Sequence, residues 1–142
     1  MKYRGLIFGL SLFTVIGNLL YWMLAFTGLT PVIEIVPGYT AWFWSFPLPD
    51  LWLSVISALL AFSIKIKRDV MAIVCGLLTA SSMIFLALNE LMFSFYTGMI
   101  YLPLADIGSD LVIKIYCLSV GTFFITQFSR QIKNQFRHIE QN

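Results

Sequence analysis

The chain has 142 residues and a formal net charge of +2, and 59% of its residues are hydrophobic while only 11% are charged. Such a composition excludes a water-soluble globular domain, in which roughly a quarter of the residues carry a charge. The small net charge gives no reason to expect a nucleic-acid partner. Thirteen Phe, six Tyr and four Trp supply the bulky apolar and interfacial side chains of a surface in contact with lipid. We therefore expect one transmembrane domain over residues 1–142, with the lipid bilayer as its surroundings.

The first expected span covers residues 5–26, which contain no charged side chain. About 20 apolar residues are needed to cross roughly 30 Å of hydrocarbon as a helix. Lys2 and Arg4 precede this run as they would in a signal peptide, but the run is too long and lacks a small-residue cleavage site. The segment is therefore predicted to be a retained helix.

The segment between the first two expected helices, residues 27–48, is predicted to be an extracytoplasmic loop. It contains several residues that do not suit a span: Pro31, Glu34, Pro37, Gly38 and Pro47. A Pro37-Gly38 turn between residues 32–36 and 39–44 fits a short β-hairpin. An interfacial loop rich in Trp fits equally well.

The remaining expected helices cover residues 49–66, 70–95 and 110–128. Pro49 suits the first turn of the second helix. The fourth helix begins at Asp110, and after that residue only Lys114 interrupts its apolar run. The fold predicted overall is all-α, a polytopic membrane protein built as a four-transmembrane-helix bundle.

Residues 129–142 are predicted to form a basic cytoplasmic tail. Apolar and basic side chains of this tail alternate with helical spacing: Ile132, Phe136 and Ile139 on one face, Arg130, Lys133 and Arg137 on another. Such a segment is typical of a helix lying along an anionic membrane surface. A frayed polar terminus is the alternative.

The orientation follows from the basic residues, because Lys and Arg in short connections are retained on the cytoplasmic side. With four spans, all the basic clusters fall on one side: Lys2 and Arg4; Lys65, Lys67 and Arg68; and Arg130, Lys133 and Arg137. The two opposite connections contain Glu34, Asp50, Asp106 and Asp110 and neither Lys nor Arg. We therefore expect both termini in the cytoplasm and a multi-pass protein of the cell membrane, plasma or inner.

Each expected helix has a stripe of small or polar residues at helical spacing. These are Ser11, Thr14, Asn18 and Tyr21; Asp50, Ser54, Ser57 and Ala61; Cys75, Ser82, Asn89 and Tyr96; and Ser119, Thr122 and Thr126. Lipid offers no hydrogen bonds, so the four stripes are predicted to face the interior of the bundle. The spacings Gly5-x-x-x-Gly9 and Gly76-x-x-x-Ala80 are signals of close helix packing.

The stronger polar groups gather toward the outer ends of the helices and form the predicted ligand-binding site: Asn18, Asp50, Asn89, Glu90, Asp110 and Lys114. Lys114 can pair with Asp110 one turn earlier, a favourable acid-before-base spacing, or extend toward the interface. A sharper hypothesis pairs Lys114 with Glu90 across helices, beside an outward-facing cavity. The Asn18 amide is expected to bond to another helix, with ligand contact as the alternative.

Familiar catalytic and cofactor motifs are missing, and the single histidine, His138, lies in the basic tail. Haem held by two histidines is excluded, and no metal site or cofactor is expected. Cys75 and Cys117 do not form a Cys-x-x-Cys pair, so a redox role has little support. No catalytic residue is predicted.

Three functions remain open. The first is binding or transport of a small or amphiphilic ligand in an outward-facing polar pocket. The second is a noncatalytic accessory subunit that docks against a larger membrane protein, or against further copies of itself, through small-residue faces. The third is a membrane enzyme that acts on a lipid-like substrate with outer-leaflet carboxylates, whose acid and base roles would need separated pKa values.

Overall fold

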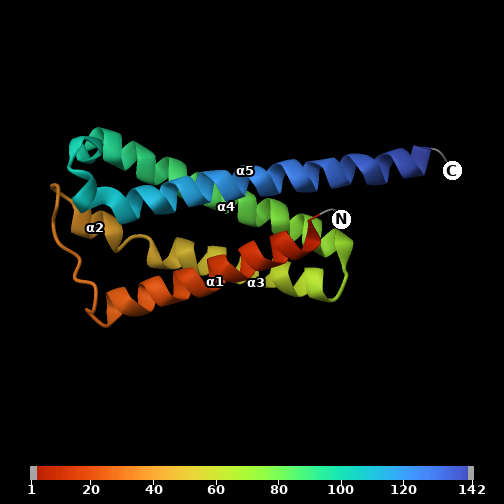
Figure 1. Ribbon diagram of the computed structural model, residues 1–142, viewed down its shortest axis with the longest axis horizontal. Helices are drawn as coiled ribbons and strands as arrows, with labels where there is room; N and C mark the ends of the chain where they lie inside the picture. Colours follow the sequence, from red (N-terminus) through yellow and green to blue (C-terminus); the bar gives the residue numbers. More distant parts are fainter. Residues whose placement is uncertain (1–2, 141–142) are drawn as a thin grey trace.

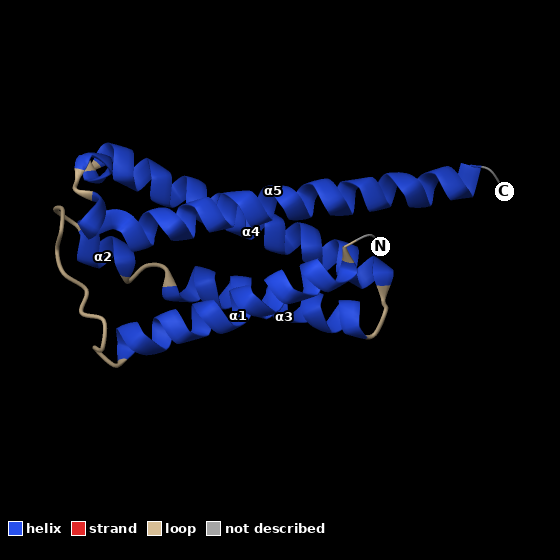
Figure 2. Ribbon diagram, viewed as in Figure 1, coloured by secondary structure: helices blue, strands red, loops and turns tan. Residues whose placement is uncertain are grey.

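The computed structural model of the chain describes the backbone of residues 3–140 and the side chains of residues 3–134. Within that part of the chain the regular structure is helical throughout, without a strand (Figure 2). The elements are α1 (Arg4–Phe26), α2 (Tyr39–Phe43), α3 (Pro47–Lys65), α4 (Asp69–Tyr96), the 3-10 helix η1 (Met99–Tyr101) and α5 (Leu104–Glu140). The predicted all-α class is confirmed.

Four helical segments are long and apolar enough to cross a membrane: Arg4–Phe26, Tyr39–Lys65, Asp69–Tyr96 and Leu104–Asn134. The predicted number of spans is therefore correct for the described residues, and a multi-pass membrane protein follows. The second span combines α2 with α3, because only the short stretch Trp44–Phe46 separates them. The fourth begins six residues before the predicted Asp110, at Leu104.

The four long helices run alternately up and down, as Figure 1 shows. Backbone packing joins α1 to α3, α3 to α4 and α4 to α5. We call the end that holds α2 and η1 the α2 end, and the end that holds the N-terminus and the α3–α4 turn the N-terminal end (Figure 1). At the latter, Arg4 donates to the carboxylate of Asp69 over 3.0 Å and so ties α1 to the start of α4.

Helices α4 and α5 approach each other closely at two glycines. A Cβ added to Gly76 would lie 2.0 Å from the ring of Phe128, and one added to Gly121 would lie 3.1 Å from the carbonyl oxygen of Ala80. The predicted packing signal Gly76-x-x-x-Ala80 thus lies where α5 contacts α4. Gly5 and Gly9 instead face open space, with no described atom within 4 Å of a Cβ.

The predicted inward stripes are correct on α1 and α3, where most members are buried: Ser11, Thr14, Ser54, Ser57 and Ala61. Asn18 and Asp50 are partly buried, whereas Tyr21 is 39% exposed. These two helices therefore meet through their polar and small residues. The hydroxyl of Ser11 is satisfied within its own helix, where it donates to the carbonyl oxygen of Ile7.

The stripe predicted for α5 is wrong, because Ser119, Thr122 and Thr126 are all exposed. The buried face of α5 contains Lys114, Cys117, Val120, Phe124 and Phe128 instead. The hydroxyl of Thr126 donates to the carbonyl oxygen of Phe123 over 2.8 Å. A hydroxyl satisfied by its own helix does not need to face the interior, so the bulky aromatic side chains decide how α5 is rotated. On α4, Cys75 is buried while Asn89 and Tyr96 are exposed.

Residues 27–48 do not form the β-hairpin considered above, because Tyr39–Phe43 form the short helix α2. Gly38 begins this helix with φ of 84°, a conformation that glycine adopts without strain. The carboxylate of Glu34 accepts hydrogen bonds from the backbone N–H groups of Gly38 at 2.5 Å and Thr40 at 2.9 Å. Free N–H groups at a helix start need such an acceptor, and the carboxylate supplies it.

The predicted tail continues α5 rather than forming a separate element. The helix runs without a break to Glu140, and Figure 1 shows it extending beyond the other helices at the N-terminal end. A helix on this axis leaves the bundle lengthwise, whereas a segment lying along a membrane surface would need a bend. The side chains of Phe136, Arg137 and Ile139, which the surface prediction used, lie outside the described residues.

Gly76→Ala is expected to destabilise the protein by about 1–3 kcal/mol, because the added methyl would displace a fully buried ring. Gly9→Ala is the matched control, since a Cβ there meets nothing. That control should change stability by less than about 1 kcal/mol. Equilibrium unfolding by denaturant in a mild detergent measures both, and equal effects of the two substitutions would contradict the close α4–α5 contact.

Acidification should release the start of α2. The hydrogen bonds to Thr40, first through its side chain and then through its backbone, lower the pKa of Glu34 from the usual 4.5. A lowered folded-state pKa means that the stabilisation is complete above that usual value and is lost as the pH falls through the lowered one. Protection of the Gly38 and Thr40 amides, measured by hydrogen exchange, should fall in that range.

Glu34→Gln should remove the same protection at neutral pH, while Asp106→Asn, another exposed carboxylate, should leave it intact. Unchanged protection in Glu34→Gln would show that the carboxylate does not hold this turn.

Candidate functional site

A cavity of about 360 Å³ lies toward the α2 end, and all five α-helices contribute to its wall. This volume falls within the range of small-molecule binding pockets. Eight of the nineteen lining residues are aromatic: Phe13, Tyr21, Trp22, Tyr39, Trp42, Phe43, Phe46 and Tyr116. Its polar groups include Thr14, Asn18, Asp50, Glu90 and Asp110. The cavity thus combines an apolar surface with a few carboxyl groups.

The aromatic part of the wall is held by ring-to-ring contacts between α1, α2 and α4. The ring of Trp42 stacks on Phe93, with centroids 4.2 Å apart and planes 12° from parallel. Trp22 packs against Phe43 with centroids 5.1 Å apart. Offset and tilted pairs of this kind are favourable arrangements of aromatic rings, so α2 is fixed to the bundle by its rings.

Asp50 at the start of α3 connects the cavity wall to α1. The Asn18 amide nitrogen donates to the carbonyl oxygen of Asp50 at 2.7 Å and to the hydroxyl of Ser54 at 2.9 Å. The indole N–H of Trp22 donates to the carboxylate of Asp50 at 2.8 Å. Asn18 therefore bonds to another helix, as expected, and both of its amide hydrogens are used within the protein.

The α1 and α5 sides of the cavity meet through side chains. The hydroxyls of Thr14 and Tyr116 lie 2.8 Å apart, and the ring of Phe13 meets that of Tyr116 edge to face at 5.5 Å. Phe13 and Val112, which also line the cavity, are 62% and 65% exposed, and Gly17, another lining residue of α1, is exposed too. The cavity therefore opens sideways, between α1 and α5.

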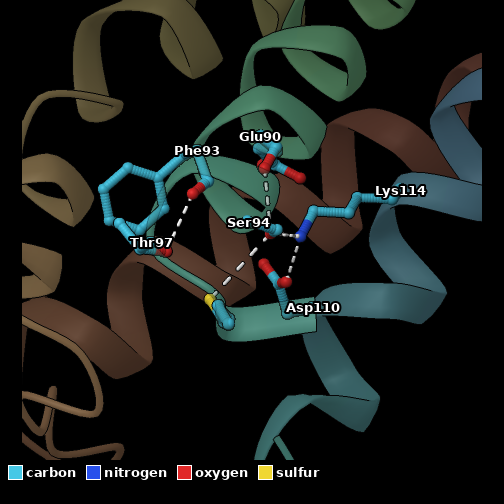
Figure 3. A network of polar contacts seen from close by, with 7 residues as sticks. Glu90, Phe93, Ser94, Thr97, Asp110 and Lys114 are labelled. Atoms are coloured by element: carbon cyan, nitrogen blue, oxygen red, sulfur yellow. Dashed lines mark hydrogen bonds and ion pairs between the residues drawn. The ribbon is translucent and has the colours of Figure 1, made fainter. Parts of the chain in front are cut away.

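Lys114 is 5% exposed and forms the polar centre of the α4–α5 contact shown in Figure 3. Its ammonium donates to the carboxylate of Asp110 and, over 2.6 Å, to the hydroxyl of Ser94. The Ser94 hydroxyl in turn donates to the carbonyl oxygen of Glu90 at 3.0 Å. Of the alternatives predicted for Lys114, the structure shows the pair with Asp110, one turn earlier in the same helix. The Lys114 ammonium makes no hydrogen bond to the Glu90 carboxylate.

Glu90 differs from the other two carboxyl groups of the cavity. Its Oε2 atom is buried and has no hydrogen-bond partner among the described residues. A buried polar atom normally has one, and leaving it unpaired is costly. Glu90 thus keeps one carboxyl oxygen unpaired among the described residues, next to the cavity that it lines.

The structure brings four of the six predicted site residues to one cavity: Asn18, Asp50, Glu90 and Asp110. Lys114 lies behind Asp110 and outside the lining. Asn89 is exposed on the far side of α4, because successive residues of a helix point about 100° apart and Glu90 takes the inward position. Asn89 therefore does not belong to the cavity wall.

Sequence analysis missed the aromatic wall, above all Trp22 and Trp42. Trp22 follows Thr14 and Asn18 on the same helical face at i+8 and i+4, a spacing that could have identified it. Trp42 was assigned to an interfacial loop, and only the folding of α2 onto Phe93 places it in the wall.

Among the residues that the structure describes, no three His, Cys, Asp or Glu side chains come close enough to hold a metal ion. Asp50, Glu90 and Asp110 line the same cavity without converging on one point. What the arrangement can offer is separate carboxyl groups along an apolar surface.

Lys114→Met should destabilise the protein by about 2–4 kcal/mol, because it leaves the partly buried carboxylate of Asp110, 16% exposed, without its counter-charge. Arg4→Met is the matched control, since the Arg4–Asp69 pair is exposed by 32% and 45% at its two side chains and should contribute about 1 kcal/mol or less. Adding Asp110→Asn to Lys114→Met should recover part of the loss. Unfolding free energies in detergent provide the comparison, and equal losses from the two single substitutions would contradict this account.

Comparison with known proteins identifies no relative. No protein-family model matches the chain, no curated protein matches it, and no solved structure matches it.

Proposed function

We propose that this chain is a multi-pass membrane protein that binds a small or amphiphilic ligand in the cavity at its α2 end. The observation that carries the proposal is the cavity of about 360 Å³, with an aromatic wall and the carboxyl groups of three helices. Apolar pockets with a few convergent polar groups are the usual form of small-molecule sites. The cavity also contains the polar groups that are most costly to place in a membrane segment, which favours a functional reason for them.

The distribution of charge supports an orientation with the α2 end outward and both termini in the cytoplasm. Basic residues lie at the N-terminal end, in the segments around Arg4 and Lys65–Arg68. At the α2 end, Glu34 lies in the loop after α1 and Asp106 in the first turn of α5, and neither connection contains Lys or Arg. The positive-inside rule assigns the basic end to the cytoplasm. The ligand site then belongs to the outer half of a cell membrane.

The sideways opening supports a ligand with an apolar part. Phe13, Gly17 and Val112 belong to membrane-spanning segments, so the mouth that they form would face the lipid chains. A molecule dissolved in the bilayer reaches such a mouth directly, with its polar group leading toward the carboxyl groups.

The other half of the bundle favours binding over conduction through a single copy. It is filled by side chains that are fully buried, among them Ile7, Leu60, Phe124 and Phe128. Transport would require this packing to open, or a path between several copies. Solute flux through the purified protein in liposomes would favour the transport form of the proposal.

Gly17→Leu is expected to abolish ligand retention, because the new side chain would enter the open mouth of the cavity without meeting another atom first. Gly9→Leu is the matched control on the same helix, since it also faces open space but lies outside the lining. Native mass spectrometry of protein released from a mild detergent should detect bound small molecules on the wild type and on Gly9→Leu only. The same adducts on all three proteins, or adducts on none, would contradict the proposal.

The second candidate function is an accessory subunit docked against a larger membrane protein or further copies of this chain. Exposed small residues favour it, namely Gly5 and Gly9 on α1 and Ser119 and Thr122 on α5. Small residues let helices approach closely in lipid. The experiment above separates the two functions, because Gly9→Leu would then dissociate larger assemblies and leave small-molecule adducts unchanged.

A further inference from the structure

The ionisable groups of the cavity wall have an excess of acid over base. Asp50, Glu90 and Asp110 line the cavity, and no basic side chain of the described residues lines it with them. Lys114 approaches from behind and pairs with Asp110. One ammonium group is therefore set against three carboxyl groups, and an anionic ligand would find no counter-charge in the wall.

The three carboxyl groups differ in the partners that they have within the protein. Asp110 has Lys114, and Asp50 accepts a hydrogen bond from the neutral indole of Trp22. Glu90 has a buried oxygen without a hydrogen-bond partner in the described part of the chain. A positively charged ligand group beside Glu90 would stabilise its carboxylate electrostatically, because an unpaired buried carboxylate is the most costly of the three arrangements.

The rest of the wall suits a cation that carries apolar groups. Aromatic faces attract cations, and the attraction is largest where water is excluded. Trp22, Trp42 and Tyr116 all line the cavity, and the stack on Phe93 holds the Trp42 ring in place. A bare metal ion would instead require converging oxygen ligands, and the described residues hold no such group.

We propose that the cavity binds an amphiphilic organic cation, with its positive group between Glu90 and Asp50 and its apolar part against the aromatic wall, extending toward the opening between α1 and α5. This inference rests on the proposed ligand-binding function and names its substrate class. Aromatic rings and carboxyl groups together recognise alkylated ammonium groups in this way.

The test compares two probes of the same shape, benzyltrimethylammonium and neopentylbenzene, which differ in a charged nitrogen against a neutral carbon. Their affinities for the full-length protein in lipid nanodiscs are measured by equilibrium dialysis. The wild type should bind the cation about tenfold more tightly or better, since cation–π and charge interactions are strong in a desolvated site.

Glu90→Gln keeps the shape of the side chain and removes its charge, so it should lower affinity for the cation about tenfold and leave affinity for the neutral probe unchanged. Asp106→Asn is the matched control, because it removes an exposed carboxylate of α5 that does not line the cavity. It should change neither affinity.

The outcomes distinguish the two levels of the proposal. Equal binding of both probes by the wild type would overturn the cationic specificity and keep the cavity as a ligand site. Binding of neither probe would overturn ligand binding itself. The wild-type comparison decides between these results even if Glu90→Gln fails to fold, and a folded Glu90→Gln protein that keeps full preference for the cation would also overturn the role of Glu90.

Discussion

A polar side chain inside a bilayer has no water to bond, so it must find its partner within the protein. This constraint accounts for the main polar contacts between the helices. Asn18 satisfies its amide on Asp50 and Ser54 and thereby joins α1 to α3. Lys114 satisfies its ammonium on Asp110 and Ser94 and joins α4 to α5. Glu90 has a buried oxygen that the described chain leaves unsatisfied, and it lies in the wall of the cavity.

The two ends of the bundle are built for different purposes. Toward the N-terminal end, Gly76 allows the ring of Phe128 to lie directly on α4, and the space between helices is filled. Toward the α2 end, the second span is interrupted after α2, and its aromatic residues line an open volume instead of closing it. A well-packed half gives the other half a rigid frame, which allows carboxyl groups to be held apart in an apolar cavity despite the cost of their burial.

The proposed ligand would offset the cost of burying these carboxyl groups. Three carboxyl groups and one ammonium around an aromatic space are unfavourable when the space is empty, and a cation with apolar groups would improve both the charge balance and the burial of apolar surface. Access from the lipid would be on the side of α1 and α5, because Phe13, Gly17 and Val112 line the cavity there and are exposed. Affinity for the cavity and partitioning into the membrane would then both favour cations that carry apolar groups.

The amino-acid sequence by itself determined the number and approximate extent of the spans, because the thickness of a bilayer sets the length of an apolar run. It also indicated that Asn18, Asp50, Glu90 and Asp110 would gather near one end, since their positions along the helices follow from the residue count.

Tertiary structure alone decided how each helix is rotated and which partner each polar group takes. Periodicity marked Ser119, Thr122 and Thr126 as a face of α5, but the bulk of Phe124 and Phe128 turned that face outward. A rotation of about 100° also separates Asn89 from Glu90. Local sequence was compatible with a hairpin after Pro37, whereas the reach of the Glu34 carboxylate to the amides of Gly38 and Thr40 favoured a helix and brought Trp42 into the cavity wall. The rotation of α5 and the position of Trp42 depend on contacts between distant segments, Gly76 with Phe128 and Trp42 with Phe93. The spacing of residues along one helix carries no information about such neighbours.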